Sequence, residues 1–91
     1  MISFQVFYEG RVQGVGFRFT VRHIAKGFDV TGWVRNLPDG RVELQVSGDH
    51  EQVRAFLDEV TQGELHSFIR KQTEAKLNEP LAARGFEIRH D

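Results

Sequence analysis

The spacing of apolar residues changes several times along this chain, and the order of these changes restricts the fold more than any other feature. Apolar residues at every second position indicate a strand with one face on the core. Residues 2–9 show this spacing, because Ile2, Phe4, Val6 and Tyr8 alternate with Ser3, Gln5 and Phe7. From Phe17 the apolar residues are three and four positions apart, which predicts a helix that ends near Gly27. The helical set is Phe17, Val21, Ile24, Ala25 and Phe28.

Two strands joined by a short turn are predicted next. Residues 30–36, Val-Thr-Gly-Trp-Val-Arg-Asn, have strand composition, and the pair Asp39–Gly40 in the following segment is typical of a tight turn. Residues 41–47 then alternate, with Val42, Leu44 and Val46 on one side and Arg41, Glu43 and Gln45 on the other. The two strands therefore form a hairpin.

A second helix and two weaker strands complete the chain. Asp49 and Gln52 resemble a capping box, and the spacing of the residues that follow predicts a helix ending near Gly63. The apolar residues of this helix are Val53, Phe56, Leu57 and Val60. Residues 66–76 have an ambiguous period and are assigned as a strand, residues 77–85 as a connection, and residues 86–88 as a short edge strand.

The resulting order is strand, helix, strand, strand, helix, strand, which is the split βαβ arrangement of ferredoxin-like α/β sandwiches. We therefore expect an α+β fold (βαββαβ), an antiparallel sheet with two helices on one face, plus a short C-terminal edge strand. The 91 residues, of which 40% are hydrophobic, suit one domain over residues 1–91. A crossover through the first helix places the segment of residues 10–17 at one end of the sheet.

Composition excludes several classes of function. The chain has no cysteine, and its histidines, at positions 23, 50, 66 and 90, lack metal-like spacing, so we expect neither a metal nor a cofactor. Twelve Lys and Arg residues against 13 Asp and Glu residues do not form the basic field of a nucleic-acid-binding protein. No apolar run is long enough for a membrane span and the N-terminus does not resemble a leader, so the expected location is the cytoplasm.

The segment Gly10-Arg-Val-Gln-Gly-Val-Gly-Phe-Arg18 is the first candidate site. A glycine-rich turn that enters a helix can direct backbone N–H groups at an anion, and the helix dipole favours negative charge there. Three well-known phosphate loops do not fit. Gly16 is followed by Phe17 rather than the lysine of a Walker loop, Phe19 replaces the third small residue of a dinucleotide fingerprint, and Val12 stands where a cysteine phosphatase has its nucleophile.

Arg18 fits a phosphoryl group because its planar guanidinium is always charged and can donate two parallel hydrogen bonds. The loop offers no nucleophile, so a reacting phosphoryl group would be attacked by water. Taken alone, the loop fits a second interpretation equally well, in which the glycines serve backbone geometry and the arginine is a surface residue.

A second segment favours the anion site. This segment is Gly32-Trp-Val-Arg-Asn36, and it is followed by Gly40, Val42 and Gly48. The loop and this segment together closely resemble the two signature motifs of the acylphosphatase family. The resemblance implies a small metal-independent hydrolase that cleaves acyl phosphates to a carboxylate and inorganic phosphate. It implies that the phosphoryl group is bound by Gln13, Gly14, Val15, Gly16, Phe17 and Arg18. It also implies that Asn36 orients the attacking water, so Arg18 and Asn36 are the predicted catalytic residues.

The implied reaction needs neither a general acid nor a protein nucleophile, and the loop offers neither. The leaving carboxylate has a conjugate-acid pKa of roughly 4–5, so it needs no general acid. Phosphoryl transfer through a loose transition state needs mainly positioning and electrostatic stabilisation, which amides and one arginine supply. Asn36 can hold a water but is too weak a base to deprotonate it, so the substrate phosphoryl group is the expected proton acceptor.

Other functions remain open at this point. The main alternative is a non-catalytic regulatory domain that binds phosphate or an acyl phosphate, because a fold does not settle a function. An RNA-binding module would need aromatic residues on its first and third strands, and the outward positions of the third strand supply none, since they are Arg41, Glu43 and Gln45. A carbamoyl-phosphate-handling domain of a larger protein is a third alternative. The expected partner is a small acyl phosphate, with no nucleic acid and no membrane, and the expected state is a monomer.

Two further expectations concern residues around the site. Trp33 and the apolar residues of the first helix are predicted to pack rather than to contact substrate. The chain continues Ile88-Arg-His-Asp91 where many acylphosphatases stop at an aromatic residue, so the sequence leaves a contact between Arg18 and the chain end undecided.

Overall fold

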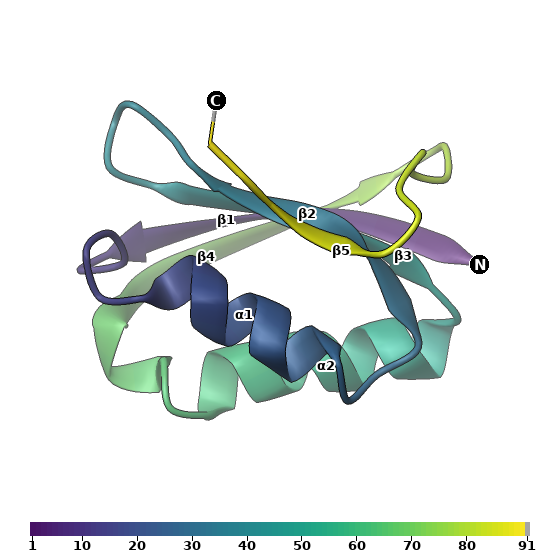
Figure 1. Ribbon diagram of the computed structural model, residues 1–91, viewed down its shortest axis with the longest axis horizontal. Helices are drawn as coiled ribbons and strands as arrows, with labels where there is room; N and C mark the ends of the chain where they lie inside the picture. The colour runs from purple at the N-terminus through teal and green to yellow at the C-terminus, as the bar shows by residue number, and fades with distance from the viewer. Residues whose placement is uncertain (91) are drawn as a thin grey trace.

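The structure, a computed structural model, describes residues 1–90. Figure 1 shows the elements as one sheet with the helices below it. In chain order they are β1 (Ile2–Gly10), α1 (Phe17–Ala25), β2 (Val30–Asn36), β3 (Val42–Gly48), α2 (His50–Gln62), the short 3₁₀ helix η1 (His66–Phe68), β4 (Ile69–Leu77) and β5 (Phe86–Arg89). No helix within these residues is long and apolar enough to cross a membrane.

The strands lie side by side in the order β4-β1-β3-β2-β5. Strand β1 pairs antiparallel with β3 and β4, and β2 pairs antiparallel with β3. Both helices cover the same face of this sheet (Figure 1), which confirms the predicted ferredoxin-like α+β sandwich. The predicted C-terminal edge strand is β5, which runs parallel to β2.

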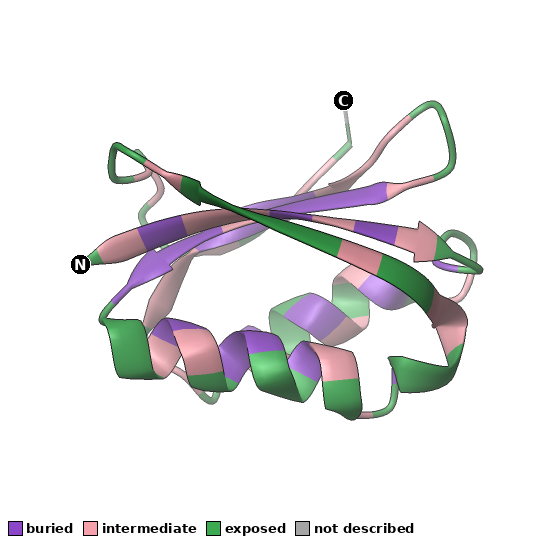
Figure 2. Ribbon diagram, turned by 180° about the vertical axis from the view of Figure 1, so that it is seen from behind, coloured by how far each residue is buried: buried purple, intermediate pink, exposed green. Residues whose placement is uncertain are grey.

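The core lies between the sheet and the two helices. Figure 2 shows that the buried stripes of both helices face the sheet while their outer surfaces are exposed. The fully buried positions repeat every second residue in the strands and every three or four residues in α2, as the sequence pattern predicts. They include Val6, Tyr8, Val34, Leu44, Val46, Val53, Phe56, Leu57 and Val60. Each such side chain contributes about 1.5–3 kcal/mol through burial.

The other face of the sheet carries a polar network. Trp33 is only 7% exposed, and its ring lies against the guanidinium groups of Arg35 and Arg89, 5.1 and 4.5 Å from the ring centroid. The buried carboxylate of Glu43 accepts hydrogen bonds from Gln5, Gln45 and Arg35. Burial opposes the charge of Glu43, but these hydrogen bonds outweigh it and hold its pKa below the usual range.

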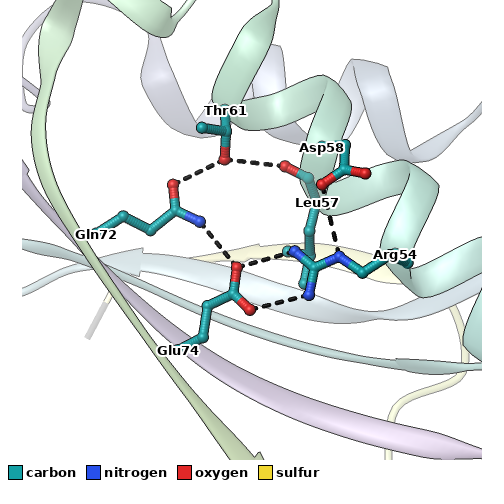
Figure 3. A network of polar contacts seen from close by, with 6 residues as sticks. All are labelled: Arg54, Leu57, Asp58, Thr61, Gln72 and Glu74. Carbon is teal, nitrogen blue, oxygen red and sulfur yellow. Dashed lines mark hydrogen bonds and ion pairs between the residues drawn. The ribbon is translucent and has the colours of Figure 1, made fainter.

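Polar contacts attach edge strand β4 to α2 (Figure 3). Arg54 donates two hydrogen bonds to the carboxylate of Glu74, each 3.0 Å long. Gln72 donates to Glu74 at 2.9 Å, and the hydroxyl of Thr61 lies 2.7 Å from the side-chain oxygen of Gln72. Every residue of this edge strand is half-buried or exposed, which explains why its apolar period was ambiguous in the sequence.

Two local predictions are wrong. The strand assigned to residues 66–76 begins only at Ile69, because residues 66–68 form η1. The capping box is also absent: Asp49 is the N-cap of α2 but its side chain makes no capping bond. The side chain of Gln52 instead accepts a hydrogen bond from the backbone N–H of Asp29, 2.8 Å away, so a contact from another part of the fold replaces the local one.

Candidate active site

The loop between β1 and α1 is held at both of its ends. Where it leaves β1, the backbone N–H of Arg11 donates to the carbonyl of Phe68, 3.0 Å away. Where it enters α1, the ring of Phe17 packs against that of Tyr8, with 5.2 Å between centroids. Gly16 is the N-cap of α1 and has φ 76°, a left-handed conformation that glycine adopts at little cost. The loop therefore ends at the N-terminus of α1, where the helix dipole places partial positive charge.

The side chain of Gln13 ties this loop to the β2–β3 hairpin. Its Nε2 donates hydrogen bonds to the carbonyl oxygens of Leu37 and Arg41, at 2.9 and 3.0 Å. The hairpin turn is the predicted Asp39–Gly40 turn, and Gly40 has φ 96°. Figure 1 shows the loop and the hairpin at the same end of the sheet. Gln13 thus holds the loop close to the end of β2, where Asn36 lies.

A pocket of about 180 Å³ lies between the loop and β2. It is lined by Val12, Gly14, Gly16, Phe17, Arg18, Phe19 and Asn36. This volume is below the roughly 300–1,000 Å³ of pockets for drug-sized ligands, so it suits a small group. Five of the seven predicted site residues line the pocket. The other two, Gln13 and Val15, do not.

Arg18 reaches the pocket from the first turn of α1 and is half-buried. Its Nη1 donates to the carbonyl oxygen of Arg89 and lies 3.3 Å from Nδ1 of His90. Arg18 therefore contacts the last strand and the residue after it, while Asp91 lies outside the described residues. Within residues 1–90 the Nε and Nη2 atoms of Arg18 have no protein partner, and both are free to donate to a bound anion.

Asn36 is the last residue of β2, and its side chain carries an unused acceptor. Its Oδ1 is buried and has no hydrogen-bond partner within the described part of the chain. A buried polar atom without a partner costs free energy, and such atoms in folded proteins call for an explanation such as a bound water or a catalytic role. In a pocket that also contains Arg18, this acceptor can hold a water molecule beside a bound anion.

The electrostatic character of the pocket follows from its lining. No lining residue is acidic, so Arg18 and the N-terminus of α1 set its sign as positive. Asp39 is engaged in the hairpin turn, where the backbone N–H and the guanidinium of Arg41 donate to it and hold its pKa below the usual range. Residues 1–90 contain no group of three or more His, Asp or Glu side chains that could hold a metal ion.

Phe19 is a pocket residue that the sequence reasoning missed. It is 69% exposed although it is large and apolar, and it is not in the set of apolar helix residues that the spacing predicts to pack. A signal was present, because Phe19 does not fit the spacing of Phe17, Val21 and Ala25, which are the buried residues of the helix. The role of the Gln13 side chain was also missed, since its partners lie 24 and 28 residues away.

Comparison with known proteins identifies the family. The family model described as Acylphosphatase matches residues 4–88. An acylphosphatase of Thermococcus kodakarensis is 44% identical over 79 residues, covering 87% of this chain and 86% of that protein. An acylphosphatase of Bacillus licheniformis is 39% identical over 87 residues, covering 96% and 93%. The crystal structure of acylphosphatase from Bacillus subtilis superposes with a TM-score of 0.88 at 32% identity, covering 97% of this chain and 98% of that one. The chain therefore belongs to the acylphosphatase family of hydrolases.

Proposed function

We propose that this chain hydrolyses the carboxyl–phosphate bond of acyl phosphates, with the phosphoryl group in the pocket between the loop and β2. One observation carries the proposal: the pocket brings together donors of Arg18 and an acceptor of Asn36 that have no partner among residues 1–90. A phosphoryl group needs the donors, and its attack by water needs the acceptor.

Binding rests on the loop and on Arg18. The backbone N–H groups of residues 13–17 supply neutral donors near the positive end of α1, and Nε and Nη2 of Arg18 supply charged ones. Gly14 and Gly16 have φ 79° and 76°, and this left-handed turn lets consecutive amides face one anion. These donors are fixed before substrate arrives, which is the condition for strong electrostatic stabilisation of a transition state.

The chemical step needs a water, an orienting group and no acid. Oδ1 of Asn36 accepts a hydrogen bond from the water, whose oxygen forms the new bond to phosphorus as the bond to the acyl oxygen breaks. The carboxylate leaves as an anion because the pKa of its conjugate acid is about 4–5. The proton of the water passes to a phosphoryl oxygen, and the products are a carboxylate and inorganic phosphate.

The pH dependence of kcat tests the proton transfer. No lining residue titrates between about pH 5 and 8, so kcat is expected to be flat over that range once the ionisation of the substrate is corrected for. A kcat that depends on a protein group with a near-neutral pKa, and that keeps this dependence in a His90→Asn variant, would show that a side chain acts as the base. The variant is needed because the imidazole of His90 contacts Arg18.

The activity itself is tested with benzoyl phosphate in the presence of EDTA. Hydrolysis that continues in the presence of EDTA supports a metal-independent acylphosphatase. A folded protein that does not hydrolyse benzoyl phosphate, but whose Tm rises with inorganic phosphate, would be the non-catalytic phosphate-binding domain. The free acceptor of Asn36 favours the enzyme, because phosphate binding alone has no use for it.

The remaining proposals concern the state of the protein in the cell. We propose that residues 1–91 act as one domain, as a monomer, in the cytoplasm, on a small acyl phosphate and without nucleic acid or membrane. Light scattering coupled to size exclusion should give a mass close to 10.5 kDa. A mass of twice that value would refute the monomer.

A further inference from the structure

A groove of about 430 Å³ runs along the exposed side of α1, next to the pocket. It is lined by Phe19, Thr20, Arg22, His23 and Lys26. Phe19 lines both the groove and the phosphoryl pocket, so the groove begins at the mouth of that pocket. A substrate whose phosphoryl group lies in the pocket can therefore extend its acyl group along the groove.

The cationic residues of the groove lie on the same face of α1 as Phe19. Residues 19, 22, 23 and 26 share one face of α1, because neighbours on a helix surface are three and four positions apart. Arg22 is about 4.5 Å along the helix axis from Phe19, at roughly 1.5 Å per residue. Since Cα–Cβ bonds tilt toward the N-terminus of a helix, the side chains of Arg22 and Lys26 leave the helix in the direction of Phe19.

These cations are not used elsewhere in the described part of the chain. Within residues 1–90 neither Arg22 nor Lys26 forms an ion pair, and no acidic residue lines the groove. Cations near the C-terminus of a helix complement its dipole, which explains part of their placement. The dipole does not explain why Phe19, an aromatic residue 69% exposed, stands between these cations and the pocket.

We propose that the groove binds the acyl part of the substrate and favours acyl phosphates whose acyl group carries a second negative charge at its far end. This inference rests on the function proposed above. The ring of Phe19 covers the carbon skeleton beyond the scissile bond, and Arg22 and Lys26 attract the distal anion. Such a surface discriminates by charge, because a neutral acyl group gains the contact with Phe19 but nothing from the two cations.

A matched pair of substrates tests the inference. The two compounds are 4-carboxybenzoyl phosphate and its methyl ester, which differ in distal charge but present the same ring to Phe19. The measured quantity is the ratio of kcat/KM for the carboxylate to kcat/KM for the ester. The variants are Arg22→Gln with Lys26→Gln, and Lys76→Gln as a control. Lys76 is exposed and pairs with Phe4, near the start of β1, whereas the pocket lies beyond the end of that strand.

The wild type is expected to prefer the carboxylate, and the double variant to lower the ratio about two- to tenfold, as fits two exposed charge interactions. The loss should appear in KM, because the contact is made before the chemical step. The wild-type ratio should also fall between 0.05 and 0.5 M salt. The Lys76→Gln control retains both groove cations, so it should keep the wild-type ratio and the same dependence on salt. A double variant with the wild-type ratio, even if it is less stable, would assign these residues to the helix dipole and overturn the inference. Wild type that hydrolyses neither compound would instead overturn the proposed function.

Discussion

Replacing Gln13 by alanine should weaken phosphate binding although this side chain does not line the pocket. The substitution removes two hydrogen bonds to the carbonyl oxygens of Leu37 and Arg41. Each contributes about 0.5–1.5 kcal/mol net. Gln13 is exposed and water can replace the lost donor, so we take the lower end, about 1 kcal/mol for both. If that free energy holds the loop in its binding conformation, the inhibition constant of inorganic phosphate rises about fivefold.

The assay is inhibition of benzoyl phosphate hydrolysis by phosphate, together with urea unfolding of each variant. Gln62→Ala is the matched control, since Gln62 is exposed on α2 and its side chain makes no hydrogen bond within residues 1–90. Gln13→Glu keeps the size of the side chain but places a carboxylate against two carbonyl oxygens, and it should bind phosphate more weakly than Gln13→Ala. A Gln13→Ala protein whose inhibition constant stays within the error of the control would show that the loop is ordered without this side chain.

Three further predictions concern stability. Tyr8→Phe should raise the free energy of unfolding by about 1 kcal/mol, and Tm by about 4–8 °C, because the buried hydroxyl of Tyr8 has no hydrogen-bond partner in residues 1–90. A lower Tm would contradict this and show that the hydroxyl does form a hydrogen bond. Hydrogen bonds from Arg54 lower the pKa of Glu74 in the folded protein. Their contribution to the free energy of unfolding is therefore complete above the unfolded-state pKa of about 4.5, and it is lost as the pH falls through the lower folded-state pKa. Glu74→Gln should therefore lower stability more at pH 7 than at pH 3, and an equal loss at both would contradict this. Gly32→Ala should lower the free energy of unfolding by about 3 kcal/mol, because a Cβ there would collide with a carbonyl oxygen of β3. Gly40→Ala should lower it by only about 1 kcal/mol, because Gly40 has φ 96° but open space around it. Equal losses of stability in urea unfolding would refute the collision.

The fold was predictable where apolar spacing and turn chemistry agree. Strand β2 has the predicted bounds, and the Asp39–Gly40 turn lies where the sequence indicates, because both depend on neighbouring residues. The prediction was wrong where a distant contact decides. Gln52 resembles half of a capping box, yet it bonds to Asp29, 23 residues away. Strand β4 has few buried positions because it lies at the edge of the sheet, and its start could not be located from spacing.

The sequence named residues of the candidate site that share one pocket, but not the contacts between them, and the roles of these residues stay predictions. The two motifs name Arg18 and Asn36, and the structure brings both to one pocket. The contact of Arg18 with His90 joins residues 72 positions apart, so no local pattern could indicate it. The Gln13 side chain and the exposed ring of Phe19 likewise depend on how the loop, the hairpin and α1 are arranged in space.

The central claim is that Arg18 binds the phosphoryl group while Asn36 acts on the water. Its most direct test is to measure kcat and the phosphate inhibition constant for Arg18→Ala and Asn36→Ala, each verified as folded by circular dichroism. Asn36→Ala should lose about 100-fold or more in kcat and bind phosphate nearly as the wild type does, while Arg18→Ala should lose both. A folded Asn36→Ala protein with wild-type kcat would contradict the account.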